Sequence, residues 1–156
     1  MRNLIYLLLI NLIILSCSNP IEPNVENNNP DCIIGELDKE ISADKIIGEW
    51  KLTRKRTLGW DNNNYDLSNE NIIYNFQSNG VLIISGSTNL NGFYESGEYI
   101  YLFEKDYLSN DSNSNGPMIW LVKIEGEKWT YKSQNDLMVI GQSYVDGSDL
   151  CFERKK

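Results

Sequence analysis

Residues 73–85, IYNFQSNGVLIIS, carry the strongest fold signal in the chain. Two runs rich in β-branched and aromatic residues flank the tripeptide Ser78-Asn79-Gly80. Such runs are typical of strands, and Asn-Gly accepts the positive φ that a tight hairpin turn needs. The stretch therefore predicts a β-hairpin.

The same pattern continues on both sides of this hairpin. Turn signals recur at Glu125-Gly126-Glu127 and Asp146-Gly147-Ser148. The only helical signal is a short turn near residues 37–45. We expect strands at residues 47–58, 71–77, 81–87, 92–96, 98–105, 118–125, 128–133 with 137–143, and 149–155. About eight strands with hairpin connections predict an all-β domain, either an up-and-down antiparallel barrel or a β-sandwich.

Composition narrows the function classes. Lys and Arg number 14 against 22 Asp and Glu, which gives a net charge of -8. This balance argues against nucleic acid as a partner and against docking on anionic lipid through protein charge. The chain has no histidine, which removes Ser-His-Asp and Cys-His catalysis and most zinc sites. The paired acids Glu95 and Glu98 fall at a turn, which gives little support to glycosidase-like chemistry. We therefore expect neither an enzyme nor a cofactor.

The N-terminus has the layout of a secretory signal. Arg2 precedes an apolar run over residues 4–15, and then Ser16 and Cys17 follow. The run is too short to span a bilayer comfortably. Residues 18–31, SNPIEPNVENNNPD, offer almost nothing apolar to bury and are interpreted as a tether. The expected organisation is a signal peptide over residues 1–16, Cys17 and the tether over 17–31, and a β domain over 32–156.

Ile14-Leu15-Ser16-Cys17 resembles the lipobox of bacterial lipoproteins. The resemblance implies that the Cys17 thiol carries a diacylglyceryl group and that the leader is cut before Cys17. Two or three acyl chains, unlike one, give stable anchoring, so the membrane is an expected partner through the lipid. Ser18 is not the Asp that retains family members at the inner membrane, so the outer membrane is favoured. The protein would lie on either the periplasmic or the outer face of that membrane. The alternative is an ordinary cleavable signal or an N-terminal membrane helix.

Two cysteines, Cys32 and Cys151, remain after Cys17 is set aside. An exported protein meets an oxidising compartment, where an even pair is most simply read as a disulfide. This bond would bring the segment before the first strand beside the last strand. Two free buried thiols are the alternative.

Gly48-Glu49-Trp50 on the first expected strand, together with Arg154 on the last, resembles the lipocalin family, especially small lipocalin-like domains behind bacterial lipoprotein signals. The resemblance implies an eight-stranded barrel that Gly48, Trp50 and Arg154 close at one end, with the basic side chain packed across the indole. A guanidinium over an indole face is a favourable cation–π contact. A chance Gly-x-Trp in another β domain is the alternative.

Aromatic residues at alternating positions either line a ligand cup or fill the interior: Tyr74, Phe76, Tyr99, Tyr101, Phe103, Trp120, Trp129 and Tyr131. Strict alternation along the first strand puts Lys51, Thr53, Lys55 and Thr57 in solvent, and Arg54 and Arg56 on the Trp50 face near the mouth. The expected ligand-binding residues are therefore Arg54, Arg56, Tyr101, Trp120 and Trp129.

Residues 111–116, DSNSNG, have the D-x-N-x-N-G spacing of a calcium loop, with Asp111, Asn113 and Asn115 as ligands. The twelfth position is Val122 instead of a bidentate Glu, so a polar surface loop without metal is favoured.

Together these features predict a lipid-anchored envelope protein that binds a small apolar or amphipathic ligand without catalysis. The alternative is a structural or protein-interaction lipoprotein with a filled barrel and an envelope protein as its partner.

Overall fold

The computed structural model describes residues 32, 41–58, 63–86, 94–108 and 116–156. The chain divides into two units, Met1–Pro30 and Asp31–Lys156, and every described residue lies in the second. The expected signal peptide, Cys17 and most of the tether lie outside the described residues. Within the described part, no helix has the length and apolar character needed to cross a membrane.

The described chain forms nine antiparallel strands and two short 3-10 helices. The strands are β1 (Gly48–Thr57), β2 (Asn64–Asp66), β3 (Ile73–Phe76), β4 (Val81–Ser85), β5 (Gly97–Asp106), β6 (Ile119–Ile124), β7 (Glu127–Gln134), β8 (Leu137–Gly141) and β9 (Ser148–Arg154). The helices are η1 (Ala43–Ile46), before β1, and η2 (Ser143–Val145), between β8 and β9.

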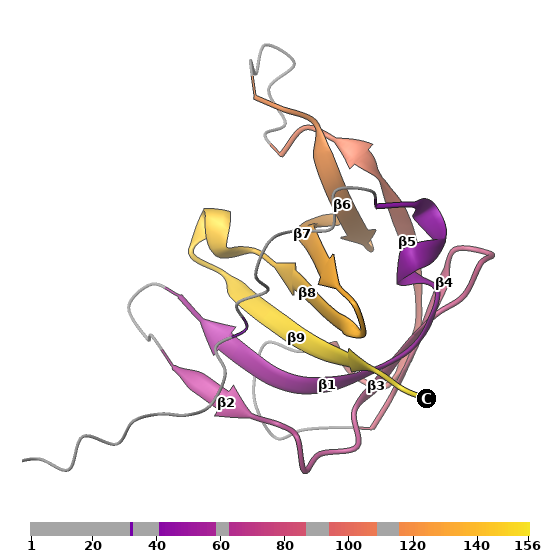
Figure 1. The fold of residues 1–156 in the computed structure, drawn as a ribbon, viewed down its shortest axis with the longest axis vertical. Helices are drawn as coiled ribbons and strands as arrows, with labels where there is room; N and C mark the ends of the chain where they lie inside the picture. The colour runs from indigo at the N-terminus through magenta and orange to yellow at the C-terminus, as the bar shows by residue number, and fades with distance from the viewer. Residues whose placement is uncertain (1–31, 33–40, 59–62, 87–93, 109–115) are drawn as a thin grey trace, which may run out of the picture. The chain divides into compact units, whose positions relative to one another are not determined.

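The sheet closes on itself. Its order is β2-β1-β3-β4-β5-β6-β7-β8-β9, and β1 also pairs with β9 along most of its length, as Figure 1 shows. The predicted up-and-down antiparallel barrel is therefore confirmed, with eight strands. The β1–β9 ladder excludes the sandwich, because it joins the two ends of the sheet into one closed surface.

The short strand β2 and the strand β3 together form one interrupted barrel strand. Both pair with β1, β2 with its second half and β3 with its first half. The Leu67 N–H donates to the Thr53 carbonyl, while the Leu52 N–H donates to the Ile72 carbonyl. Adjacent residues of β1 thus bond to Leu67 and Ile72, and residues 68–71 loop out between them. This interruption explains why β2 was not predicted from the sequence.

One predicted strand is wrong in its described part. Residues 94–96, from the expected strand over 92–96, have no strand geometry, and residues 92–93 lie outside the described part. Tyr94 instead packs inward against the core from the segment before β5. The helical turn expected near residues 37–45 coincides in its described portion with η1.

A β-bulge in β1 reverses the expected facing of its second half. Leu52 pairs with Phe152 and Arg54 pairs with Cys151, so Thr53 is an extra residue with no partner of its own in the ladder. Beyond the bulge, Lys55 pairs with the buried Leu150. The expectation that Arg54 and Arg56 share the Trp50 face is therefore wrong, and Lys55 points inward.

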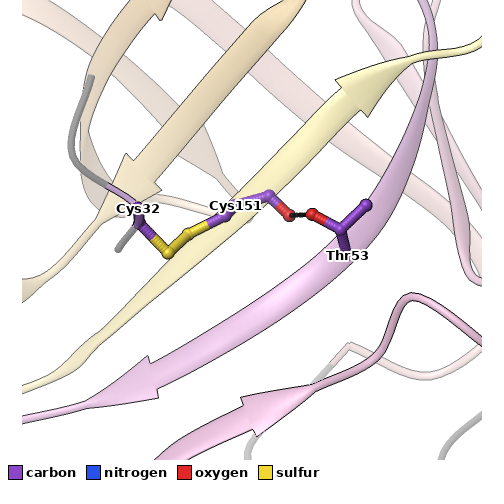
Figure 2. Close-up of a disulfide and its surroundings, with 3 residues drawn as sticks. All are labelled: Cys32, Thr53 and Cys151. Atoms are coloured by element: carbon purple, nitrogen blue, oxygen red, sulfur yellow. Dashed lines mark hydrogen bonds between the residues drawn. A yellow bond between two sulfur atoms is a disulfide. The ribbon is translucent and has the colours of Figure 1, made fainter. Parts of the chain in front are cut away.

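The predicted disulfide joins Cys32 to Cys151, across 119 residues, with Cα atoms 5.9 Å apart. Cys151 lies on β9 between the inward-facing Leu150 and Phe152, so the bond ties Cys32 to the outside of the barrel. Figure 2 shows the bulged residue beside it, where Thr53 Oγ1 donates to the Cys151 carbonyl at 3.2 Å.

Candidate functional site

One end of the barrel is closed around Trp50, which is 1% exposed. Its Nε1 donates to the Ile46 carbonyl of η1 at 2.7 Å. The Arg154 guanidinium lies 4.1 Å from the centre of the indole ring. Its Nη1 donates to the Ile47 carbonyl at 3.0 Å and its Nη2 to the Lys45 carbonyl at 2.7 Å. Arg154 thus fastens η1, the first strand and the last strand together over the indole.

The arrangement gives a physical reason for Gly48 two residues before Trp50. Gly48 has a φ of +120°, which residues with side chains rarely adopt. A Cβ atom built there would meet Arg154 Nη1 at 3.0 Å. Glycine therefore allows both the turn into β1 and the approach of the guanidinium.

Large side chains are buried inside the barrel. The buried cluster consists of Ile46, Trp50, Leu52, Leu67, Ile72, Tyr74, Phe76, Leu82, Ile84, Tyr101, Val122, Ile124, Trp129, Tyr131, Met138, Ile140, Leu150 and Phe152. Phe76 packs edge-on against Tyr101, and Tyr74 against Phe152, each with ring centres 5.0 Å apart. Contacts of this kind add to the free energy of burial.

Two of the expected ligand-binding residues belong to this buried cluster. Tyr101 and Trp129 are both buried, and the Tyr101 hydroxyl donates to the Gln77 carbonyl at 2.6 Å. Burial also raises the pKa of the Tyr74 and Tyr101 hydroxyls. These phenols stay protonated at neutral pH and do not serve as bases there.

Trp120, another of the expected residues, is only partly buried. Its ring stacks on Phe103 with centres 4.7 Å apart and planes inclined by 25°. Lys105 Nζ lies 5.6 Å from the centre of the same ring. Trp120 is thus the one expected ligand-binding residue whose ring is both partly exposed to solvent and close to an ammonium group.

Lys55 is the unexpected member of the interior, with an exposure of 4%. It sits on the inward face opposite Tyr65 and Leu150. Desolvation lowers its pKa, because burial penalises the charged ammonium. Alternation alone could not have found it, since a one-residue bulge exchanges the two faces of a strand.

Arg54 and Arg56 take part in an outer row of charges. Arg54 pairs in register with Asp66 on β2, and Arg56 with Asp149 on β9. The Asp66 pKa is lowered, mainly by hydrogen bonds from Ser68, with a smaller contribution from Arg54. Opposite charges across neighbouring strands stabilise a sheet modestly. The two arginines thus have a structural environment outside the barrel.

The outer face of β4 and β5 carries apolar side chains in adjacent positions. Val81 lies directly opposite Ile100 in the ladder, and Leu102 follows on the same face of β5. Ile100 is 68% exposed and Leu102 is 55% exposed. We call Val81, Ile83, Ile100 and Leu102 the outer apolar patch. No sequence signal marked it, because apolar residues at inward and outward positions of a strand look alike in the sequence.

No cluster of three or more potential metal-binding side chains occurs among the described residues. Asp111, Asn113 and Asn115 of the considered calcium loop lie outside the described part.

No known protein family, curated protein or solved structure matches this chain significantly.

Proposed function

We propose that the chain is a lipid-anchored, non-catalytic envelope protein whose filled barrel serves as a rigid support for binding another protein. The observation that carries this proposal is the cluster of large buried side chains inside the barrel. These side chains come from every barrel strand, while apolar side chains stand exposed on the outside of β5. A barrel that uses its interior as core has its outer surface left for recognition.

The lipocalin-like character is part of the same proposal. The Gly48, Trp50 and Arg154 arrangement supports it, because each residue has a definite role in closing one end of an eight-stranded barrel. Lipocalin-like barrels serve many functions, so this likeness favours the scaffold and does not select a ligand.

The anchor in this proposal is the lipid on Cys17, in the outer membrane. The lipobox-like Ile14-Leu15-Ser16-Cys17 and the polar tether after it support this location. Metabolic labelling of the host with a clickable fatty acid tests it. Cys17→Ser should abolish the label while wild type carries it, and equal labelling of the two would overturn the anchor.

Native mass spectrometry of the full chain, extracted from the membranes of its host in mild detergent, tests the filled barrel. The expected mass is that of the lipidated protein alone. A reproducible excess mass that disappears on denaturation would refute the filled barrel and identify the ligand.

A second candidate function is the binding of a small apolar or amphipathic ligand. The partly buried Phe103–Trp120 stack beneath Lys105 favours it, because an aromatic platform with one ammonium suits a planar or apolar anion. A probe such as anilinonaphthalene sulfonate should then bind wild type and bind Trp120→Ala much less. Equal binding to both proteins would remove this candidate.

A further inference from the structure

We propose that the outer apolar patch is the docking surface, and that its partner is a protein segment in which apolar side chains are flanked by Lys or Arg. The inference rests on the proposed function, since it names the surface and the chemistry of the partner.

Strand register makes the patch continuous. Val81 faces Ile100 across the β4–β5 ladder, and Ile83 faces Glu98. Because side chains alternate along a strand, Ile100 and Leu102 lie on the outer face on either side of the inward-facing Tyr101. Directly opposed side chains on neighbouring strands have Cβ atoms only about 5 Å apart, so these residues form one surface.

Carboxylates surround this surface. Glu98 and Glu104 continue the outer row of β5 beyond Ile100 and Leu102, and both are exposed. The Glu125 carboxylate reaches the patch from the β6–β7 turn, where it accepts the Ile100 N–H at 2.8 Å. Three acidic groups therefore border the apolar residues.

Among the described residues, the cations near the patch are already engaged by carboxylates. Lys123 pairs in register with Leu102, but its Nζ contacts Glu104 and Asp106, each at 2.7 Å. Lys128 Nζ also contacts Asp106, at 3.3 Å. Glu98, Glu104, Asp106 and Glu125 thus outnumber the two lysines, and the rim of the patch is negative.

The sign of this rim selects the partner. A second copy would bring the same acidic rim against itself, and an anionic lipid surface would be repelled as well. The whole chain has a net charge of -8, which strengthens both objections. A basic, apolar segment buries the exposed Ile100 and Leu102 while its cations face Glu98 and Glu125.

Photo-cross-linking in the native host tests the surface. A benzoylphenylalanine replaces Ile100 in the full chain, and a matched variant carries it at Val145, an apolar residue of η2 that is 61% exposed. The expected result is one cross-linked protein at Ile100 and none at Val145, with the attached peptide rich in Lys or Arg. If the Ile100 variant fails to fold, a variant that carries benzoylphenylalanine at Leu102 replaces it.

Charge reversal tests the chemistry. Glu98→Lys, in the cross-linking background, should lower the yield at least about threefold, whereas Glu153→Lys, an exposed acid on β9, should leave it unchanged. The yield should also fall as salt increases. Equal effects of the two reversals, or an acidic attached peptide, would overturn the basic partner.

The outcomes separate the inference from the proposed function. A protein that cross-links at Val145 but not at the patch would refute the docking surface. The proposed function, a barrel that binds another protein, would still stand. A cross-linked dimer of the chain, or lipid attached at Ile100, refutes the partner named here. The lack of any protein adduct from Ile100, Leu102 or Val145 would refute the proposed function itself.

Discussion

Replacing Trp50 with Ala should remove about 4 to 6 kcal/mol from the free energy of unfolding. The indole is almost wholly buried and belongs to the core cluster. Truncating a buried Phe or Trp to Ala typically costs about 3 to 5 kcal/mol. The lost bond from Nε1 leaves the Ile46 carbonyl without its donor, which adds about 1 kcal/mol.

Trp50→Phe is the matched control, because it keeps most of the apolar volume and loses the Nε1 bond. We expect it to cost about 1 to 2 kcal/mol. Arg154→Met removes the guanidinium together with its bonds to the Ile47 and Lys45 carbonyls. Combined with Trp50→Ala it forms a double-mutant cycle, whose coupling should be about 0.5 to 2 kcal/mol for a cation–π contact at 4.1 Å.

Urea denaturation followed by far-ultraviolet circular dichroism measures each change. With a slope of about 1.5 kcal/mol per molar urea, Trp50→Ala should lower the midpoint by about 3 to 4 M. Lys155→Met is a surface control, because its exposed ion pair with Glu49 contributes at most about 1 kcal/mol. A loss below about 1 kcal/mol for Trp50→Ala, or a cycle with no coupling, would refute the closed-end argument.

Four further outcomes are expected. Gly48→Ala should destabilise the fold by more than about 1 kcal/mol in the same urea assay, because φ is +120° at this position. An unchanged free energy of unfolding would contradict the argument that this position requires glycine. Reduction of the Cys32–Cys151 bond should lower stability by about 2 to 5 kcal/mol, whereas alkylation of two thiols without reductant would disprove the bond. Burial lowers the Lys55 pKa, so the unfolded chain binds more protons than the folded chain between the folded pKa and 10.5. The free energy of unfolding of wild type, relative to that of Lys55→Met, should therefore rise with alkaline pH. A difference that does not change with pH would argue against a buried ammonium. The Asp106 pKa lies at about 2, chiefly because Lys123 donates a hydrogen bond to its carboxylate. The stabilising effect of this carboxylate is present above pH 3.8 and is lost as pH falls through about 2. In carboxyl NMR titrations Lys123→Met should shift the Asp106 midpoint upward, and an unchanged midpoint would exclude Lys123 as the cause.

Much of the fold follows from local sequence, because turns and strand composition are local properties. The Asn79-Gly80 turn has its glycine at a φ of +84°, between β3 and β4 as predicted. The strands from β5 to β9 begin and end close to the predicted residues. The strand predicted at residues 71–77 corresponds to β3, but β2 was missed, because β2 and β3 become one strand only through their common partner β1.

The candidate sites were predicted less well. Tyr101 and Trp129 were correctly placed on inward positions, but sequence cannot say whether an inward aromatic fills the core or lines a cup. That depends on what faces it across the barrel, as Phe76 faces Tyr101. The outer apolar patch gave no signal, since Ile100 and Tyr101 have similar apolar character and only their facing distinguishes them.

The sequence by itself determined the strand-rich class, the tight turns and the acidic charge, because each depends on residue type and spacing. It left the Cys32–Cys151 bond open against two free thiols, and the structure shows the bond. Tertiary structure decided whether the sheet closes into a barrel and which side chains of β1 point inward. Closure needs β1 to pair with β9, whose paired residues lie 91 to 104 positions apart in the sequence, and no local preference encodes that ladder. Facing turned on the single bulged residue Thr53, which moved Lys55 into the interior and Arg54 out of it. Because side chains alternate with a period of two, one extra residue exchanges the inside of a strand for its outside.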